Sequence, residues 1–443
     1  MDEPKNNRLW TKQYLLVIAT NFLLYIVYYQ LMLWTTSYAM HVWHADVSEA
    51  GLAAGLFIIS ALTARLLAGH FIDGLGRGFV LRAGTILYAA AMLPYFHITS
   101  MLEFEAVRVL HGFAYGLAST AASTIVATII PIRRQGEGIG YFTLGVTIAS
   151  AIGPFLGIWF THRGMYDASV WICTVVGFTA LALSLLIRTP AHRMNDEERR
   201  EMHSLRFSTF FETEALPISF IAMLGGVCYS TVLAYIGAYS QSLSLFWAGS
   251  VFFLGFALTS IVSRPVTGRL LDELGGSVVV YPALIFLALA MIVIGAARSN
   301  GMLLSGALVL GLGFATITSA CHALAVFVSP QKHVGRATAT YFVLLDVGVG
   351  IGPYTLGLLV PHLGFSAVYY AAAVVAMIGI VIYWAAIGRT GIFSQWTMKR
   401  VRALRLNEIE IDPAAVSRAK REGREAEIPK VPANREPHEL TFN

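Results

Sequence analysis

A near-copy of one twelve-residue motif recurs in this sequence 199 positions further on. RLLAGHFIDGLG occupies 65–76 and RPVTGRLLDELG occupies 264–275, with Arg, Gly, Asp, Leu and Gly at the same places. The same offset, without a gap, relates five further pairs: Gly112 and Gly311, Pro131 and Pro330, Gly136 and Gly335, Gly153 and Gly352, and Pro154 and Pro353. Because these residue types fix backbone shape and charge, their clustering indicates that the chain is two copies of one unit.

The composition is that of a membrane protein. The 443 residues are 56% hydrophobic and only 13% charged, and the mean hydropathy is +0.65. Twelve hydrophobic runs have about the 20 residues that cross a bilayer core. They lie at 14–38, 51–71, 79–98, 102–130, 138–160, 168–187, 216–239, 245–271, 278–297, 302–328, 337–360 and 365–387. The predicted fold class is an all-α integral membrane protein with twelve transmembrane helices in two pseudo-symmetric six-helix bundles.

Basic side chains predict the orientation in the membrane. Lysine and arginine gather before the first hydrophobic run, in alternate loops and in the central linker, whereas the other loops hold only Arg163 and Arg298. Since cytoplasmic loops carry the basic excess, both termini and the linker are predicted to be cytoplasmic, in a plasma membrane protein. The first run is too long for a signal peptide and no small-residue cleavage site follows it, so we expect it to remain as a helix.

The predicted domains follow from the hydrophobic runs. They are a cytoplasmic N-terminal tail at 1–12, a first bundle at 13–188, a cytoplasmic linker at 189–215, a second bundle at 216–388 and a cytoplasmic tail at 389–443. The linker is predicted to be partly helical near 196–204, and the tail to be disordered from 428 onward.

The stretch KRVRALRL at 399–406 alternates basic and apolar side chains. This pattern predicts a basic amphipathic segment lying on the inner leaflet, with a regulatory or partner-binding role as the alternative. The net charge of +5 likewise indicates contact with anionic lipid and not with nucleic acid.

Several functional classes lack their signatures. Cys173, Cys228 and Cys321 all fall within hydrophobic runs and form no CxxC motif, so we interpret them as packing residues. The sequence has no P-loop, which argues against direct use of ATP. A nucleophile with its base and a metal-binding cluster are also missing, so we expect no metal, no cofactor and no enzymatic activity.

Three further segments resemble the major facilitator superfamily, and within it the twelve-helix drug:proton antiporter branch. GHFIDGLGRG at 69–78 is similar to the loop signature of the superfamily. RVLHGFAYG at 108–116 is similar to the arginine–glycine motif of the branch, and PIRRQGEGIGY at 131–141 also looks like family sequence. The resemblance implies a transporter whose two bundles alternate between the two sides of the membrane.

The loop signature has a physical reading of its own. Gly69 and Gly76 permit close backbone approach and a sharp turn. Gly74 and Gly78 stand where the family usually has basic residues, so this loop is less basic than is typical.

The resemblance implies a conformational latch. In the family, the aspartate matching Asp73 faces the start of helix eleven, here 335–338, in the outward-open state. A carboxylate at a helix N-terminus contributes about 0.3–1 kcal/mol. Arg77 and Glu137 are expected to extend this contact into a charge network, and Asp272 repeats it in the second half. A solvated loop turn is the alternative.

The fifth hydrophobic run resembles the antiporter motif of the family. It has Gly140, Gly153, Pro154 and Gly157 at the motif's spacing, while Ala149 and Ile158 replace two glycines. Small residues let membrane helices pack closely and proline bends a helix, so we expect a bent helix five packed tightly against helix eight. Ordinary helix packing explains the same residues, and only the resemblance connects them with export.

Ionisable residues within the membrane are candidates for proton coupling and binding. Asp346 is the one acid expected near mid-depth, where loss of hydration favours its protonated form. A structural ion pair or hydrogen bond is an equally good interpretation. Glu105 and His322 are the next candidates for proton coupling. Arg108 is expected either to hold an anionic substrate group or to pair with Glu105.

Polar and aromatic side chains form stripes on two helices. Asn21, Tyr25 and Tyr29 follow one face of helix one, and Tyr235 and Tyr239 do so on helix seven. They are candidates for lining a central cavity, and interhelical packing is the alternative. Helix one has no acid, although many drug antiporters of the family carry one there, so a broad specificity for cationic drugs is not supported.

Together these observations predict a proton-coupled secondary active exporter of small molecules. The expected partners are a small-molecule substrate, protons and membrane lipids, and the chain is expected to act as a monomer. The alternatives are a proton symporter for uptake, an exporter dedicated to one metabolite such as a sugar or a metallophore, and a membrane receptor.

Overall fold

The structure, a computed structural model, describes residues 8–45, 47–189, 210–407, 409, 411–424 and 428–429. Within these residues, twelve helices are long and apolar enough to cross a membrane. They contain α1 (Lys12–Val42), α2 (Val47–Leu75), α3 (Arg77–Ala90), α4 (Met101–Ile129), α5 (Gln135–His162), α6 (Tyr166–Leu185), α8 (Leu216–Ser242), α9 (Phe246–Leu274), α10 (Gly276–Gly295), α11 (Asn300–Val328), α12 (Val334–Gly357) and α13 (Val360–Ala386). The third span begins with α3 and runs on to Phe96. The predicted all-helical fold class and the twelve predicted spans are confirmed. The linker helix predicted near 196–204 and most of the tail predicted to be disordered lie outside the described residues.

Serine caps and glycine turns occur at equivalent places in the two halves of the chain. Ser100 and Ser299, which the 199-residue offset relates, cap α4 and α11 by accepting a hydrogen bond from a backbone N–H three residues ahead. Gly76 and Gly275 have φ angles of 94° and 97°, a conformation that favours glycine, and turn the chain from α2 into α3 and from α9 into α10. The sequence repeat is therefore also a repeat of backbone geometry.

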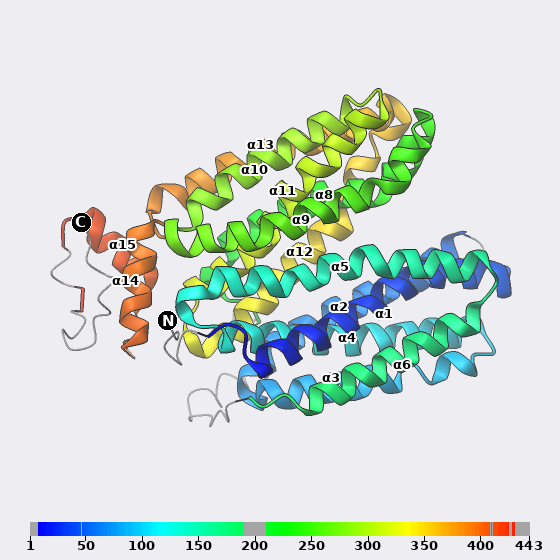
Figure 1. The fold of residues 1–443 in the computed structure, drawn as a ribbon, viewed down its shortest axis with the longest axis horizontal. Coiled ribbons are helices and arrows are strands. Elements are labelled where there is room, and N and C mark those ends of the chain that lie inside the picture. The colour runs from blue at the N-terminus through cyan, green and yellow to red at the C-terminus, as the bar shows by residue number, and fades with distance from the viewer. Residues whose placement is uncertain are drawn as a thin grey trace.

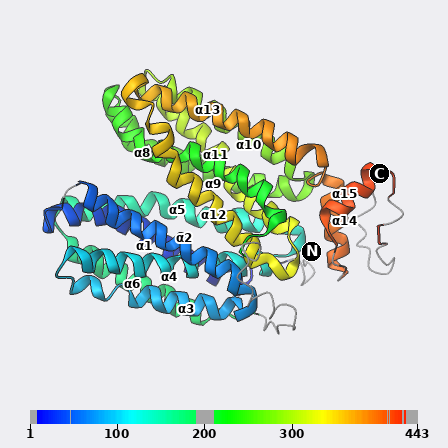
Figure 2. The ribbon, with the colours of Figure 1, turned by 180° about the vertical axis from the view of Figure 1, so that it is seen from behind.

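Helices α1–α6 form one bundle and α8–α13 the other (Figures 1 and 2). The bundles meet at the end nearest the chain termini and diverge toward the opposite end (Figure 1). Between the bundles, α2 packs against α12 and α5 packs against α9. The 199-residue offset converts one of these crossings into the other. We call the end where they meet, which carries Asp73 and Asp272, the closed end.

Glycine permits close contact at the crossings. A Cβ on Gly136 of α5 would lie 2.6 Å from the carbonyl oxygen of Gly268 in α9, and a Cβ on Gly268 would lie 2.6 Å from that of Gly136. The equivalent positions at the other crossing are Gly335 and Gly69, where a Cβ would also overlap the facing helix. The backbones therefore approach more closely than any larger residue allows.

The C-terminal tail does not fold as predicted. Helix α14 (Gln395–Leu406), which α15 (Pro413–Arg421) follows, buries Val401 and Leu404 in the hydrophobic core of the second bundle. The guanidinium of Arg405 donates hydrogen bonds to the carbonyl oxygens of Phe327 and Ser329, where α11 ends. The apolar face that predicted contact with the inner leaflet is instead covered by protein, because the end of the second bundle offers it an apolar surface and free carbonyl groups.

Replacing Gly136 with valine is expected to separate α5 from α9. The added carbons would collide with the backbone of Gly268, so cysteine-linked spin labels at the exposed positions Arg82 and Leu274 should move apart, as double electron–electron resonance can measure. Gly237→Val is the matched control, since a Cβ there meets nothing within 4 Å. Unchanged distances in the Gly136 variant would contradict a crossing limited by glycine.

Candidate functional site

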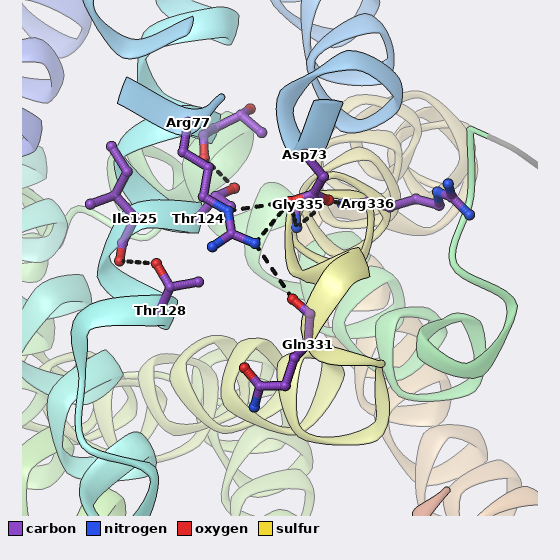
Figure 3. Close-up of polar contacts among 9 residues, drawn as sticks. Asp73, Arg77, Thr124, Ile125, Thr128, Gln331, Gly335 and Arg336 are labelled. Atoms are coloured by element: carbon purple, nitrogen blue, oxygen red, sulfur yellow. Dashed lines mark hydrogen bonds and ion pairs between the residues drawn. The ribbon is translucent and has the colours of Figure 1, made fainter. Parts of the chain in front are cut away.

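The carboxylate of Asp73 caps a helix of the opposite bundle. Asp73 lies near the end of α2 and accepts hydrogen bonds from the backbone N–H of Gly335 at 3.0 Å and of Arg336 at 3.3 Å (Figure 3). These N–H groups belong to the first turn of α12, where the helix dipole favours a negative charge. The contact between Asp73 and the start of helix eleven, which the family resemblance implied, is present in this structure.

Asp272 makes the equivalent contact from the second bundle to the first. Its carboxylate, near the end of α9, accepts hydrogen bonds from the backbone N–H groups of Gly136 and Glu137, each at 2.9 Å. The 199-residue offset maps these three residues onto Asp73, Gly335 and Arg336. Each bundle therefore caps one helix of the other at the closed end, and we call the two contacts the first cap and the second cap.

The two caps obtain their positive charge from different places. In the first cap, Arg77 lies four residues after Asp73 and its Nη2 is 3.1 Å from the carboxylate (Figure 3). In the second half, Gly276 occupies the position equivalent to Arg77, so the repeat supplies no guanidinium there. Arg402 of α14 takes its place, with Nη2 2.7 Å from the Asp272 carboxylate. The tail thus completes the second cap.

Glu137 links the two bundles by a further ion pair. Its carboxylate lies 2.7 Å from Nε of Arg134 in its own half and 2.9 Å from Nε of Arg269 in α9. The Glu137 side chain is nearly buried whereas Arg269 is exposed, so this network lies at the rim of the closed end. Arg77 has no contact with Glu137, and the expected single charge network is divided between the two caps.

A cavity of about 190 Å³ lies between the bundles. Aromatic side chains from both halves make up nearly half of the residues that line it, among them Tyr25, Tyr28, Tyr29, Phe57 and Tyr115 from the first and Tyr229, Phe256, Phe314, Tyr341 and Phe342 from the second. Tyr229 and Phe314 stack with ring centroids 4.0 Å apart. The charged residues of the lining are Arg65, Arg264 and Asp346. Such a wall suits a small molecule with an apolar body and a charged group.

Arg65 and Asp346 form an ion pair across the two bundles. Nε of Arg65 in α2 lies 3.2 Å from Oδ2 of Asp346 in α12, and the side chains are 4% and 24% exposed. The guanidinium also lies over the ring of Phe342, 4.7 Å from its centroid. Asp346 was a sequence candidate for proton coupling, and its geometry fits both interpretations that the sequence left open, a proton carrier and a structural pair.

The cavity includes only part of the aromatic stripes expected from the sequence. Tyr25 and Tyr29 line it, whereas Asn21 is buried elsewhere in α1. The hydroxyl of Tyr235 donates to a carbonyl oxygen of α12 at 2.6 Å, and that of Tyr239 donates to carbonyl oxygens of α10 at 3.0 Å. Both stripes follow one helix face, but helical spacing does not tell which neighbour that face meets.

The remaining charged candidates are also not part of the cavity lining. Arg108 donates to a backbone carbonyl of α2 at 3.3 Å and to the hydroxyl of Tyr95 at 3.4 Å, and no ion pair with Glu105 is present among the described residues. His322 is fully buried and stacks on Tyr341 with ring centroids 4.8 Å apart. None of the three candidates belongs to the lining of the cavity.

The helix-five residues pack against two different helices. A Cβ on Gly140 would lie 2.9 Å from the carbonyl oxygen of Arg264, so this glycine brings α5 against α9, the eighth span. Gly153, by contrast, packs against Tyr29 of α1. Pro154 lies inside α5, and Gly157 is buried one turn further on.

Sequence reasoning did not assign Arg65, Arg264, Tyr229 or Arg402 to the site. A signal existed for the two arginines, since each opens a copy of the repeated stretch inside a membrane run, where a charge is a functional candidate. Nothing local distinguishes Tyr229 from the other tyrosines of α8. The role of Arg402 depends on how the tail folds back onto the second bundle.

The family model of the Major Facilitator Superfamily matches residues 14–275 and 218–395 of this chain. The chain therefore belongs to this superfamily. It is a multi-pass membrane transporter and not an enzyme. Its described residues contain no group of three or more His, Cys, Asp or Glu that could hold a metal ion.

Similar proteins span most of the chain. An uncharacterized MFS-type transporter of Methanocaldococcus jannaschii is 24% identical over 344 residues, which are 76% of this chain and 88% of that protein. The multidrug resistance protein MdtG of Escherichia fergusonii is 21% identical over 339 residues, 75% and 83% of the two chains. The staphylopine export protein of Staphylococcus aureus is 22% identical over 337 residues, 74% and 84%. The solved proton:xylose symporter XylE shares the fold, with a TM-score of 0.67 at 14% identity over 84% of this chain and 95% of that one.

Asp73→Asn is expected to weaken the first cap without unfolding the protein. The amide keeps the size of the side chain but removes the charge that favours the helix N-terminus, so the ratio of the closed-end population to the open one should fall about twofold to fivefold. Spin-label distances across the closed end measure this population. Glu273→Gln, an exposed acid beside Asp272, is the control. An unchanged ratio would mean that the contact of Asp73 with α12 does not stabilise the closed end.

Arg402→Gln is expected to open the second cap. The carboxylate of buried Asp272 would lose its pairing with the Arg402 guanidinium and keep only two backbone N–H donors, so the ratio of the closed-end population to the open one should fall by roughly tenfold or more. Arg400→Gln on the same helix is the control, since Arg400 bonds an exposed carbonyl of the tail. The double variant Arg402→Gln, Asp272→Asn tests whether the two residues act together. If the free-energy effects of the two single substitutions add fully in it, Arg402 and Asp272 are not coupled.

Proposed function

We propose that this protein is a proton-coupled secondary active exporter of small molecules that works by alternating access. One observation carries the proposal: the only acid in the lining of the cavity, Asp346, is paired with an arginine of the other bundle. The protonation of an acid in that position depends both on what occupies the cavity and on how the two bundles are arranged. The active unit would be one chain in the plasma membrane, since both bundles belong to it.

The conformation described is interpreted as outward-facing. The bundles meet at the end that carries the termini, and the positive-inside rule assigns that end to the cytoplasm. In the opposite state, both caps would be broken and the bundles would separate at the cytoplasmic end. The 199-residue repeat supports such a rocking motion, because equivalent crossings on both sides of the cavity can open together.

A proton on Asp346 would change the balance between the two states. While the carboxylate is charged, separating it from Arg65 leaves an uncompensated charge in a region shielded from water, which is costly. Protonation removes the attraction and leaves a neutral acid that separates at lower cost. A ligand shifts a conformational equilibrium only through such a difference between states, and the proton has one here.

Export is the direction that the relatives support. One of them is a staphylopine export protein, and another is a multidrug resistance protein, a role that export of drugs can supply. The helix-five residues Gly140, Gly153, Pro154 and Gly157 resemble the antiporter motif and add to this support. Neither argument identifies the substrate.

A second candidate is proton-coupled uptake. It is favoured by the charges of the cavity, because a proton on Asp346 would leave Arg65 and Arg264 without an acid among the lining residues. A proton and an anion would then bind better together than separately, which is the condition for symport.

Vesicles containing the purified protein and the pH dye pyranine distinguish the two directions. Compounds are added outside, and the luminal pH is followed. An antiporter releases protons from the lumen as the compound enters, whereas a symporter brings protons in with it. The direction of proton movement relative to the compound is the same for either orientation of the protein in the vesicle membrane. Absence of proton movement with any transported compound would overturn proton coupling.

Asp346→Asn is expected to abolish transport driven by a pH gradient. The amide mimics the protonated acid permanently, so the proton-dependent step is lost, while exchange of labelled for unlabelled compound should persist. Asp167→Asn, the same change at an exposed position at the start of α6, is the control. Full gradient-driven accumulation by the Asp346 variant would move the coupling site to another residue.

A further inference from the structure

Arg264 is a buried cation for which the described part of the chain supplies no paired acid. It is 5% exposed, lies in the middle of α9 and lines the central cavity. Its Nη2 donates to the hydroxyl of Thr318 at 3.3 Å, but Nε and Nη1 have no hydrogen-bond partner. Among the residues that line the cavity, Asp346 is the one acid, and it is paired with Arg65.

The internal repeat explains what is missing beside Arg264. Arg65 and Arg264 occupy equivalent positions in the two halves, and the 199-residue offset places the equivalent of Asp346 at Thr147 in α5. Thr147 is in the lining of the cavity but carries no charge. One half therefore contains both members of an ion pair, and the other contains the arginine alone.

A buried guanidinium without a counter-charge destabilises the protein unless a ligand supplies an anionic group that accepts its hydrogen bonds. Unsatisfied donors of a buried charged group lose the hydration that they have in water. Arginine presents its donors in a planar fork that fits a carboxylate, a phosphate or a sulfonate. The aromatic walls around it, including Tyr29, Tyr229 and Phe314, fit an apolar or planar body.

We infer that the substrate is a small organic anion whose anionic group binds Arg264, in the place that the other half of the protein fills with Asp346. This inference rests on the proposed transport function but not on its direction. It adds a specificity residue, Arg264, and a substrate class that membership of the superfamily does not assign.

Equilibrium binding tests the inference without transport. Isothermal titration of the purified protein with 2-naphthoate, with its neutral isostere 2-naphthamide and with the cation 2-naphthylmethylammonium compares three charges on one aromatic body. Because a hydrogen bond to a charged group contributes about 1.5–3 kcal/mol, 2-naphthoate should bind about tenfold or more tightly than the amide. Arg264→Gln should remove this difference, and Arg264→Lys should keep part of it. Arg298→Gln, at an exposed loop, is the control.

A second pair of variants leaves Arg264 in place. Thr147→Asp would supply the missing acid from within the protein, so it should abolish the preference for naphthoate, whereas Thr147→Asn should retain it. Aspartate and asparagine have nearly the same size, so the comparison of the two variants isolates the effect of the negative charge. Equal binding of naphthoate and naphthamide to the unaltered protein would overturn the inference, as would an anion preference that survives Arg264→Gln. Failure of proton coupling in vesicles with anion binding intact would overturn only the proposed energy source.

Discussion

Three acids between the two bundles, Asp73, Asp272 and Asp346, find donors or a counter-charge on the opposite bundle, since lipid provides neither. Asp73 does so at the start of α12, Asp272 at the start of α5, and Asp346 at Arg65. All three contacts join opposite halves. The arrangement of the bundles is therefore determined by a few polar contacts, set in surfaces whose glycines allow close approach.

The repeat makes the departures from symmetry informative. The glycine crossings and the two helix caps are duplicated residue by residue, which suits parts that must open and close together. Two places differ. Gly276 replaces the arginine of the first cap, and Arg402 of the tail supplies the missing charge. Thr147 replaces the acid of the cavity pair, and no residue of the cavity lining supplies the missing charge for Arg264. We therefore associate the first asymmetry with control of the closed end and the second with the substrate.

The sequence was sufficient for the fold because membrane helices are specified by local composition, and the repeat relates their halves. Asp73 and Asp272 stood out because the repeat keeps both of them and the stretch around Asp73 resembles the loop signature of the family, and Asp346 stood out because an acid within the membrane is rare. It could not pair Asp346 with Arg65, because that contact depends on the crossing of α2 and α12. Tyr235 and Tyr239 were misplaced for the same reason: periodicity identifies a shared face, but only packing decides whether that face meets a cavity or another helix. The docking of α14 depends equally on tertiary contacts.

The closed end is held by several contacts of modest strength, and this is what a transporter needs. A carboxylate at a helix N-terminus contributes about 0.3–1 kcal/mol, or up to about 2 kcal/mol when partly buried. Two such caps and the Glu137 network therefore stabilise the closed end by an amount similar to what one bound ligand or one proton can change. A much stronger interface would hold the protein in one state. Because the contribution of Arg402 comes from the tail and not from the repeat, the balance between the two states can be altered at the C-terminus without any change in the cavity.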